Sequence, residues 1–203
     1  MNSGRTIAIA GAGSIGCFVG GMLVAGDRGV ALLARSRVIG EIEANGLRPT
    51  SFEGFDRTFA ANRFALSEDP SILGDAAVVL VAVKSADTAA MADVIARHAP
   101  TDAVIVSLQN GVDNAERLRA VLPGVQVAAA VVYVATEMAG PGHLRHHGRG
   151  ELVIEPSPRS EAVARALIAA GVPTEVSDNV RGALWSKLIL NCAYNALSAI
   201  TQM

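Results

Sequence analysis

The first residues whose types and spacing could carry chemistry form a glycine-rich turn, Gly11-Ala12-Gly13-Ser14-Ile15-Gly16. An apolar run, Thr6–Ala10, predicts a strand before the turn, and Ser14 to about Ala25 predicts a helix after it. In that context the first glycine permits a tight turn, the second lets a pyrophosphate approach the backbone, and the third lets the helix pack closely. The helix N-terminus adds unpaired N–H groups and positive potential. A glycine turn that binds nothing and a methyltransferase-type loop are the alternatives.

A basic segment follows the second predicted strand, Val30–Ala34, and reads Ala34-Arg35-Ser36-Arg37. A dinucleotide fold selective for NAD carries Asp or Glu about twenty residues after the glycines, where it binds the ribose 2′-hydroxyl. This segment has no acid. Two guanidiniums and a hydroxyl suit a 2′-phosphate, so the segment predicts NADP(H) with Arg35 as the leading ligand. A solvated basic turn is the alternative.

Two polar segments follow the next two predicted strands of the sheet. Lys84 comes directly after the most apolar run, Ala76–Val83, and Gln109-Asn110-Gly111 follows Ala103–Leu108. Ligands of open α/β sheets bind beyond the carboxyl ends of the strands, so the amides of Gln109 and Asn110 are expected at this rim, and Lys84 and Asn110 near cofactor and substrate. A plain surface lysine and an asparagine that caps a helix are the alternatives.

The last predicted helix, from Val180 to Met203, carries a narrow polar stripe on an otherwise apolar surface. Its members recur at i, i+4, i+8 and i+11 and fall within roughly an 80° arc: Lys187, Asn191, Asn195 and Ser198. A lysine among apolar neighbours can protonate a carbonyl oxygen, and asparagines can orient a carboxylate and hydroxyls. The stripe therefore suggests a site lining, although an ordinary helix packed on one side would show a related pattern.

The elements that must position these residues alternate between strands and helices. Further helices are predicted at about Val38–Asn45, Ala86–His98, Asn114–Val121 and about Ser160–Ala170, and further strands at Val125–Ala135, Leu144–His147 and Glu151–Ile154. The stretch from Leu47 to Leu66 is less regular. The alternation predicts an α/β, Rossmann-like, doubly wound and mostly parallel sheet over residues 1–178. Residues 179–203 then begin a second, all-α unit.

Composition excludes several classes of protein. The chain has 203 residues, 51% of them hydrophobic, with 17 Lys+Arg against 19 Asp+Glu, so nothing favours disorder, nucleic acid or a membrane surface as partner. The uncharged run from Thr6 to Gly26 reaches the length of a membrane span, but its six glycines argue against a span or a signal peptide.

The cysteines and histidines show no ligand spacing. Cys17 and Cys192 lie far apart, which favours a reducing, cytoplasmic setting. His146 and His147 are neighbours in a predicted strand and must point to opposite faces, and His98 and His143 have no ligand-spaced partner. No metal site is expected.

Taken together, the glycine turn, Arg35, Val83-Lys84, Gln109-Asn110-Gly111 and the helix from Leu184 to Asn195 closely resemble the ketopantoate reductase family (2-dehydropantoate 2-reductase). The W-x-K-x3-N-x3-N pattern of that helix is the specific part. The resemblance implies NADPH-dependent reduction of 2-dehydropantoate, a small 2-oxo acid, to (R)-pantoate in pantothenate and coenzyme A biosynthesis. It implies that Lys187 is the general acid, that Asn191 and Asn195 hold substrate, that Lys84 and Asn110 lie where cofactor meets substrate, and that Arg35 binds the 2′-phosphate.

The sequence departs from this family in its length. Members carry a helical second domain that contributes a Ser and a Glu to the substrate site, and this sequence ends at Met203, within the first helix of that domain. A truncated reductase that binds NADP without a closed substrate pocket is therefore expected. A non-catalytic NADP-binding or interaction module and a reductase of another 2-oxo acid are the alternatives, and a homodimer is compatible with the resemblance.

Overall fold

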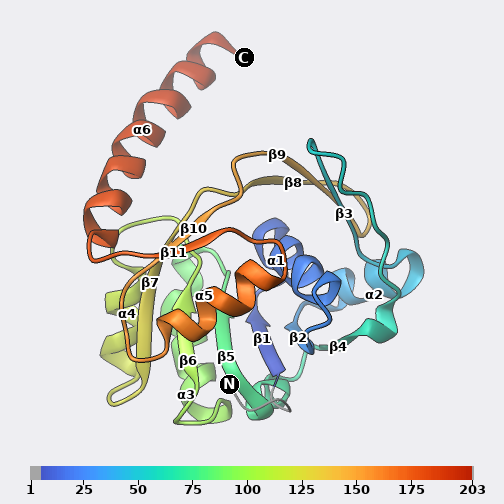
Figure 1. Cartoon of the computed structure of the whole chain (residues 1–203), viewed down its shortest axis with the longest axis horizontal. Helices are drawn as coiled ribbons and strands as arrows, with labels where there is room; N and C mark the ends of the chain where they lie inside the picture. The colour runs from blue at the N-terminus through green and yellow to red at the C-terminus, as the bar shows by residue number, and fades with distance from the viewer. Residues whose placement is uncertain (1–5, 203) are drawn as a thin grey trace.

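The fold is built on an eight-stranded sheet, described by a computed structural model for residues 6–202 (Figure 1). The strand order is β11-β10-β7-β6-β5-β1-β2-β4. All neighbours in it pair in parallel except β10 and β7. The strands are β1 Thr6–Ala10, β2 Val30–Leu33, β4 Phe64–Ser67, β5 Ala76–Val81, β6 Val104–Ser107, β7 Gln126–Val132, β10 Leu152–Ile154 and β11 Thr174–Val176. The predicted doubly wound, mostly parallel sheet is confirmed.

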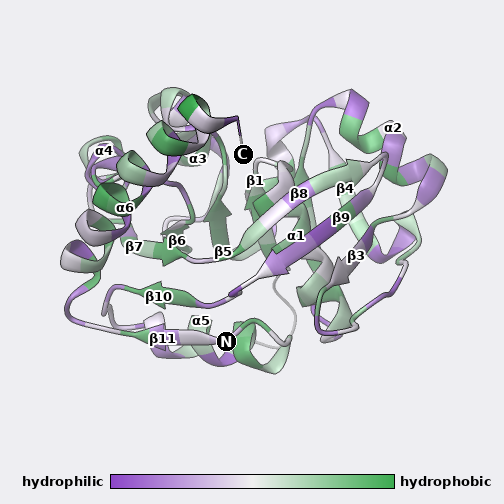
Figure 2. Ribbon diagram, turned by 90° about the horizontal axis from the view of Figure 1, so that it is seen from above, coloured by the Kyte–Doolittle hydropathy of each residue, from purple (hydrophilic) through white to green (hydrophobic). Residues whose placement is uncertain are grey.

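Helices cover both faces of this sheet and leave its central strands buried. They are α1 Ser14–Ala25, α2 Ser36–Asn45, α3 Thr88–His98, α4 Asn114–Val121, α5 Ser160–Ala169 and α6 Val180–Thr201, with short 3-10 helices η1 Ala61–Arg63, η2 Pro70–Asp75 and η3 Ser85–Asp87. One core cluster joins the sheet to α1, α2 and α5, and the other joins it to α3, α4 and the start of α6. Because both faces are covered, strands such as β5 read as continuous apolar runs (Figure 2).

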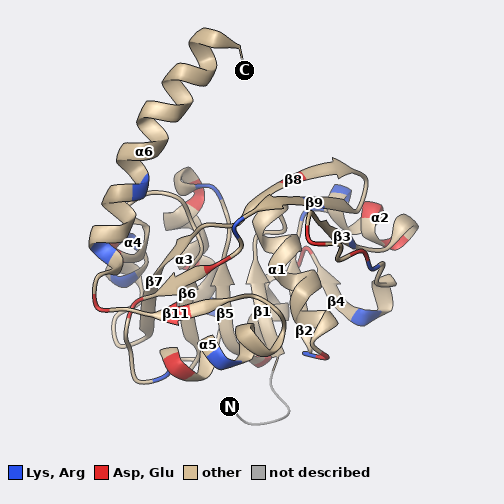
Figure 3. Ribbon diagram, turned by 45° about the horizontal axis from the view of Figure 1, so that its top comes forward, with Lys and Arg blue, Asp and Glu red and all other residues tan. Residues whose placement is uncertain are grey.

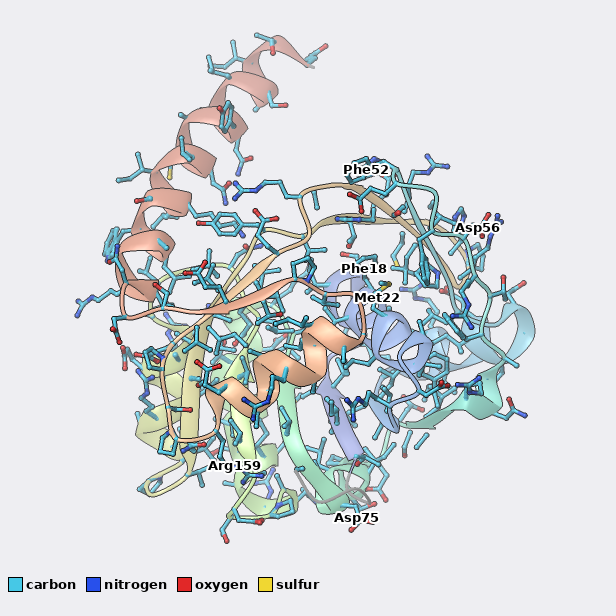
Figure 4. The ribbon with its side chains drawn as sticks, in the orientation of Figure 1. Phe18, Met22, Phe52, Asp56, Asp75 and Arg159 are labelled. Atoms are coloured by element: carbon cyan, nitrogen blue, oxygen red, sulfur yellow. The ribbon has the colours of Figure 1, made fainter. Side chains whose placement is uncertain are left out.

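A second, three-stranded sheet lies over α1. It has the order β3-β9-β8 and contains β3 Arg48–Ser51, β8 Ala135–Gly140 and β9 His143–Gly148. Figure 4 shows Phe18 and Met22 on α1 beneath these strands. The centre of the Phe18 ring lies 4.8 Å from the centre of the buried His146 imidazole. His147 is exposed on the opposite face, as the alternation of side chains along a strand predicts.

Several strand predictions were wrong. The irregular stretch from Leu47 to Leu66 contains β3 and most of β4, the long strand Val125–Ala135 is broken after Val132, and β8 and β11 were not predicted. β3, β4 and β11 are short and only partly buried, so they lack the apolar runs that mark the central strands. The break after Val132 moves the chain from one sheet to the other.

The uncharged run from Thr6 to Gly26 forms β1, the glycine turn and α1, not a single membrane-length helix. Among residues 6–202, no helix combines the length and the apolar character that crossing a membrane requires.

Helix α6 is long and projects away from the body of the molecule (Figure 1). Val180 and Leu184 are buried against the sheet, but the large apolar side chains beyond them are exposed: Trp185, Ile189, Leu190, Tyr194, Leu197 and Ile200. Beyond Lys187 the helix carries no charged residue (Figure 3). One end of α6 therefore belongs to the core, and the rest presents an uncovered apolar surface.

Candidate active site

The glycine turn between β1 and α1 has the geometry that its sequence predicts. Gly11 has φ +107°, and a Cβ there would lie 2.8 Å from the Val83 backbone. A Cβ on Gly16 would lie 2.1 Å from the Gly11 carbonyl oxygen, so α1 can approach the turn only through a glycine. By contrast, a Cβ on Gly13 would meet no atom within 4 Å. Open space lies in front of Gly13, where the first N–H groups of α1 point.

That open space belongs to a cavity of about 710 Å³ along the carboxyl ends of β1, β2 and β5. Gly11, Ala12 and Gly13 form one wall, Arg35 and Arg37 another, and Lys84 lines it at the end of β5. Gly13 is the N-cap of α1 and makes no side-chain cap, which leaves the N-terminal N–H groups to an anion. A glycine turn, a helix N-terminus and cationic side chains around one cavity fit a dinucleotide phosphate.

Two carboxylates in the same cavity were missed by the sequence analysis. Glu68 and Asp87 both line it. Glu68 follows β4, which pairs with β2 next to the segment that holds Arg35, and the Ala34 N–H donates to the Ser67 carbonyl at 3.0 Å. The absence of an acid after β2 therefore does not make this end of the cavity free of acids, because the fold supplies one from the neighbouring strand.

A buried amide network joins the loop after β5 to the loop after β6. The Gln109 side-chain amide donates to the Val83 carbonyl at 3.1 Å and to the Thr88 hydroxyl at 2.7 Å. Thr88 in turn donates to Asn114 Oδ1 at 2.9 Å. Asn114 Nδ2 donates to the Asn110 carbonyl at 2.8 Å. Gln109 was predicted to present its amide at the rim of the sheet, but it is buried, and it holds the rim from inside.

Asn110 meets Lys187 at the end of this network. The Lys187 ammonium donates to Asn110 Oδ1 at 2.9 Å and to the carbonyl of Val132. The Ser85 hydroxyl donates to the Asn110 carbonyl at 2.8 Å, so the residue after Lys84 holds the asparagine that faces the lysine. Within residues 6–202, neither Asn110 nor Lys187 lines the large cavity itself. They are linked to the cavity through the loop after β5, where Lys84 lines the cavity and Ser85 bonds to Asn110.

The environment of Lys187 lowers its pKa below the ordinary lysine value. Burial is the main cause, and the positive charge of Arg149 adds to it. Both hydrogen-bond acceptors of the ammonium are neutral oxygens, which do not offset the desolvation as a carboxylate would. The ring of Tyr133 lies beside the ammonium, with its centre 5.7 Å from Nζ. A lysine of lowered pKa is better matched to proton donation near neutral pH.

The remaining members of the polar stripe lie further along α6. Asn191 is half-buried and Asn195 and Ser198 are exposed. The single helix from Val180 to Thr201 places Lys187, Asn191 and Asn195 on one side, as their spacing predicts. The structure therefore brings Lys187 and Asn110 together directly, whereas the two asparagines continue the stripe away from the sheet.

Three residues around Asn110 and Lys187 were not among the predicted site residues: Asn114, which bonds to Asn110, and Tyr133 and Arg149, which lie near the lysine. Asn114 was assigned to the start of a helix, and Tyr133 to the interior of a strand. Only Arg149, which stands between two glycines, carried a local signal, because an arginine in a Gly-Arg-Gly turn is held in an uncommon backbone conformation.

Comparison with known proteins agrees with this geometry. The family model described as "Ketopantoate reductase PanE/ApbA" matches residues 7–159. The chain is 32% identical to the 2-dehydropantoate 2-reductase of Halobacterium salinarum over 97% of its own length and 66% of the relative's. It is 33% identical to that of Mesorhizobium japonicum over 96% of its own length and 67% of the relative's. The chain thus spans about two thirds of the length of these relatives.

Solved structures show the same fold. The crystal structure of a PanE/ApbA family ketopantoate reductase from Ralstonia eutropha JMP134 superposes with a TM-score of 0.89 at 55% identity, covering 98% of this chain and 65% of that one. A D-mandelate dehydrogenase in complex with NADH and anilino(oxo)acetate superposes with a TM-score of 0.82, but at 22% identity it shows the fold alone. On the matched family model and the shared fold, the chain belongs to the ketopantoate reductase PanE/ApbA family.

Proposed function

We propose that the protein is an NADPH-dependent 2-dehydropantoate 2-reductase, which reduces the C2 ketone of 2-dehydropantoate to give (R)-pantoate. The observation that carries the proposal is the Lys187 ammonium, which is half-buried and bonded to neutral oxygens beside the end of the cofactor cavity. Its relatives of 32% and 33% identity bear the name of this activity.

The cofactor belongs, in this proposal, to the large cavity. The Gly11–Gly16 turn and the N-terminus of α1 would receive the pyrophosphate, and Arg35 would receive the 2′-phosphate of NADP(H). Lys84 and Asn110, on the loops after β5 and β6, would lie toward the nicotinamide. When bound, the reduced nicotinamide supplies the hydride for the ketone carbon.

Lys187 acts on the ketone oxygen. Its ammonium stabilises the negative charge that develops there and then donates a proton, so the ketone oxygen becomes the C2 hydroxyl of the product. Asn110 fixes the ammonium through Oδ1, and Asn191 and Asn195 would hold the substrate's polar groups along α6. Because the ammonium form is the acid, the rate should fall as the pH rises through a pKa below the ordinary value for lysine.

The experiment is NADPH oxidation by 2-dehydropantoate, followed by absorbance, with the wild-type chain and with Lys187→Ala. We expect turnover that depends on 2-dehydropantoate and falls by at least about 100-fold in the variant, because general acid catalysis and charge stabilisation are both lost. Undiminished turnover in Lys187→Ala would refute the role of the lysine. Replacing NADPH by NADH in the same assay measures cofactor preference.

A second candidate is an NADP-binding module without turnover. It is favoured by one observation, the exposed apolar side chains that follow Lys187 on α6, because catalysis at the lysine would require a site that excludes water. Titration calorimetry with NADPH, combined with the oxidation assay, separates the two proposals. Binding of NADPH without any oxidation by 2-dehydropantoate supports the module, and turnover supports the reductase.

A further inference from the structure

The loop between β9 and β10 holds an arginine in an unusual backbone conformation. Arg149 has φ +54°, and the glycines on either side have φ +158° and +143°. Arginine gains nothing from the left-handed region, which costs a residue with a Cβ of the order of 1 kcal/mol. The following Gly150 is buried, and a Cβ there would lie 3.0 Å from the His146 ring. The loop is therefore fixed, and it turns one long cationic side chain in a definite direction.

That direction is toward Lys187. The Arg149 guanidinium lies 3.9 Å from the centre of the Tyr133 ring, and the Lys187 ammonium lies 5.7 Å from the same centre. The Tyr133 N–H donates to the Glu151 carbonyl at 3.0 Å, so the backbone that carries the ring is held beside the residues that follow Arg149. Two cations from distant parts of the sequence thus share one aromatic ring.

The charges around this ring do not balance. Arg149 uses Nε and Nη2 on one oxygen of Glu151, at 2.7 Å and 2.6 Å. In the described part of the chain its Nη1 edge has no hydrogen-bond partner, and the acceptors of Lys187 are neutral. Two positive charges therefore stand against a single carboxylate. An anion bound near both cations would relieve this repulsion.

We propose that Arg149 receives the carboxylate of the 2-oxo acid whose ketone oxygen Lys187 protonates. This inference rests on the proposed function. A 2-oxo acid carries its carboxylate on the carbon next to the ketone, so it presents two adjacent electronegative groups to two adjacent cations. The free edge of a guanidinium, held by Glu151 and by the face of Tyr133, suits a carboxylate, whereas an ammonium suits a developing alkoxide.

Arg149 takes no part in bond making under this proposal. It keeps its protons throughout, and the proton that reaches the ketone oxygen comes from Lys187. What Arg149 provides is selectivity: acids bind, and uncharged ketones of the same shape bind poorly. Its charge also lowers the pKa of Lys187, and a bound carboxylate would partly cancel that effect.

The test compares two ligands that differ in charge. The 203-residue chain with saturating NADP+ is titrated by calorimetry with 2-dehydropantoate and, separately, with its uncharged lactone. The variants are Arg149→Gln, Arg149→Lys and the control Arg145→Gln. Arg145 is an exposed arginine of β9 that pairs with Glu137, so the control removes one positive charge from the strand that leads into the Arg149 loop. Circular dichroism and thermal unfolding check that each variant is folded.

We expect Arg149→Gln to weaken the binding of 2-dehydropantoate at least about tenfold and to leave the affinity for the lactone unchanged, because a charge-assisted bidentate contact is lost only for the acid. Arg149→Lys should recover part of the lost affinity, and Arg145→Gln should change the affinity for neither ligand. Equal losses for acid and lactone, or no loss for the acid, would overturn the proposal. If the wild-type chain binds NADP+ but no acid, Arg149 is not a carboxylate site. If NADP+ itself does not bind, it is the proposed function that fails.

Discussion

The glycine cradle around Gly11–Gly16 and the cluster around Lys187 are built in opposite ways. The cradle is made by the backbone of six consecutive residues, and its geometry follows from which of them lack a Cβ. In the lysine cluster, the two hydrogen bonds of the ammonium cross 77 and 55 residues of sequence. The geometry of a site made by one short backbone segment depends little on changes elsewhere in the fold. The geometry of a site made by distant side chains depends on every loop that carries them.

The two cysteines give the largest contrast between the cradle and α6. Cys17 lies on α1 behind the glycine turn, where its thiol donates to the Ala12 carbonyl at 3.4 Å, and burial, helped by the charge of Glu41, raises its pKa to about 12. Cys192 is exposed on α6. At pH 8, iodoacetamide should modify Cys192 while Cys17 reacts about a thousandfold more slowly, because only the thiolate reacts.

Mass spectrometry of timed samples measures both rates. The Cys192→Ser variant is the control, and it should show no fast-reacting thiol. Comparable rates at the two cysteines would mean that α1 opens readily, and the cradle would then not be the rigid part of the molecule.

Adding a single methyl group to the cradle should separate binding from folding. Gly13→Ala meets no atom within 4 Å and has φ −81°, so the protein should fold as before, while NADPH affinity should fall about 100-fold because the methyl group occupies the phosphate's place. Gly16→Ala would place its Cβ 2.1 Å from a backbone oxygen and should also lose about 1–3 kcal/mol of stability.

Urea unfolding and NADPH calorimetry on both variants check this pair. Gly29→Ala, whose Cβ would make an ordinary 3.6 Å contact with Thr6, is the control. Loss of stability in Gly13→Ala, or full NADPH affinity in either cradle variant, would contradict the assignment.

The contrast also explains what the sequence could predict. The glycine turn, the central strand β5 and the polar stripe of α6 are local patterns, and the structure has each of them where it was expected. Glu68 and Tyr133 could not be found in that way, because strand order places them: Glu68 reaches the cavity through the pairing of β4 with β2. The Gly-Arg-Gly turn marks Arg149 as unusual, but it does not show that the arginine lies near Lys187. Gln109 was found but misplaced, since a residue after a buried strand can turn inward as well as outward.

The buried amide network should couple the two regions. Gln109→Ala removes two donors and leaves the Val83 carbonyl without its partner, which should cost about 1–3 kcal/mol. Because the same loop carries Lys84 and supports Asn110 through Ser85, both NADPH affinity and the pKa of Lys187 should change. Urea unfolding measures the stability, calorimetry measures the NADPH affinity, and NMR of lysine ammonium groups measures the pKa of Lys187.

Asn62→Ala, at an exposed site in η1, is the control and should change none of these three quantities. An unchanged Lys187 signal in Gln109→Ala would show that the regions are independent.

The smallest expected effect concerns cofactor preference, where side chains rather than backbone decide within the cradle itself. Arg35 and Glu68 line the same cavity with opposite charges. Arg35→Ala should weaken the binding of NADPH about tenfold more than that of NADH, since only NADPH has a 2′-phosphate. The effect is limited to this size because the arginine is exposed to solvent, which screens its charge. Glu68→Gln should act in the other direction and increase the affinity for NADPH a few-fold, because it removes the repulsion between the carboxylate and the phosphates.

Calorimetry with both cofactors gives the ratio of the NADPH and NADH affinities, and Arg97→Ala, on the exposed side of α3, is the control. If Arg35→Ala weakens both cofactors equally, the arginine does not read the 2′-phosphate, and Glu68 is then the residue to examine as a ligand of the ribose 2′-hydroxyl.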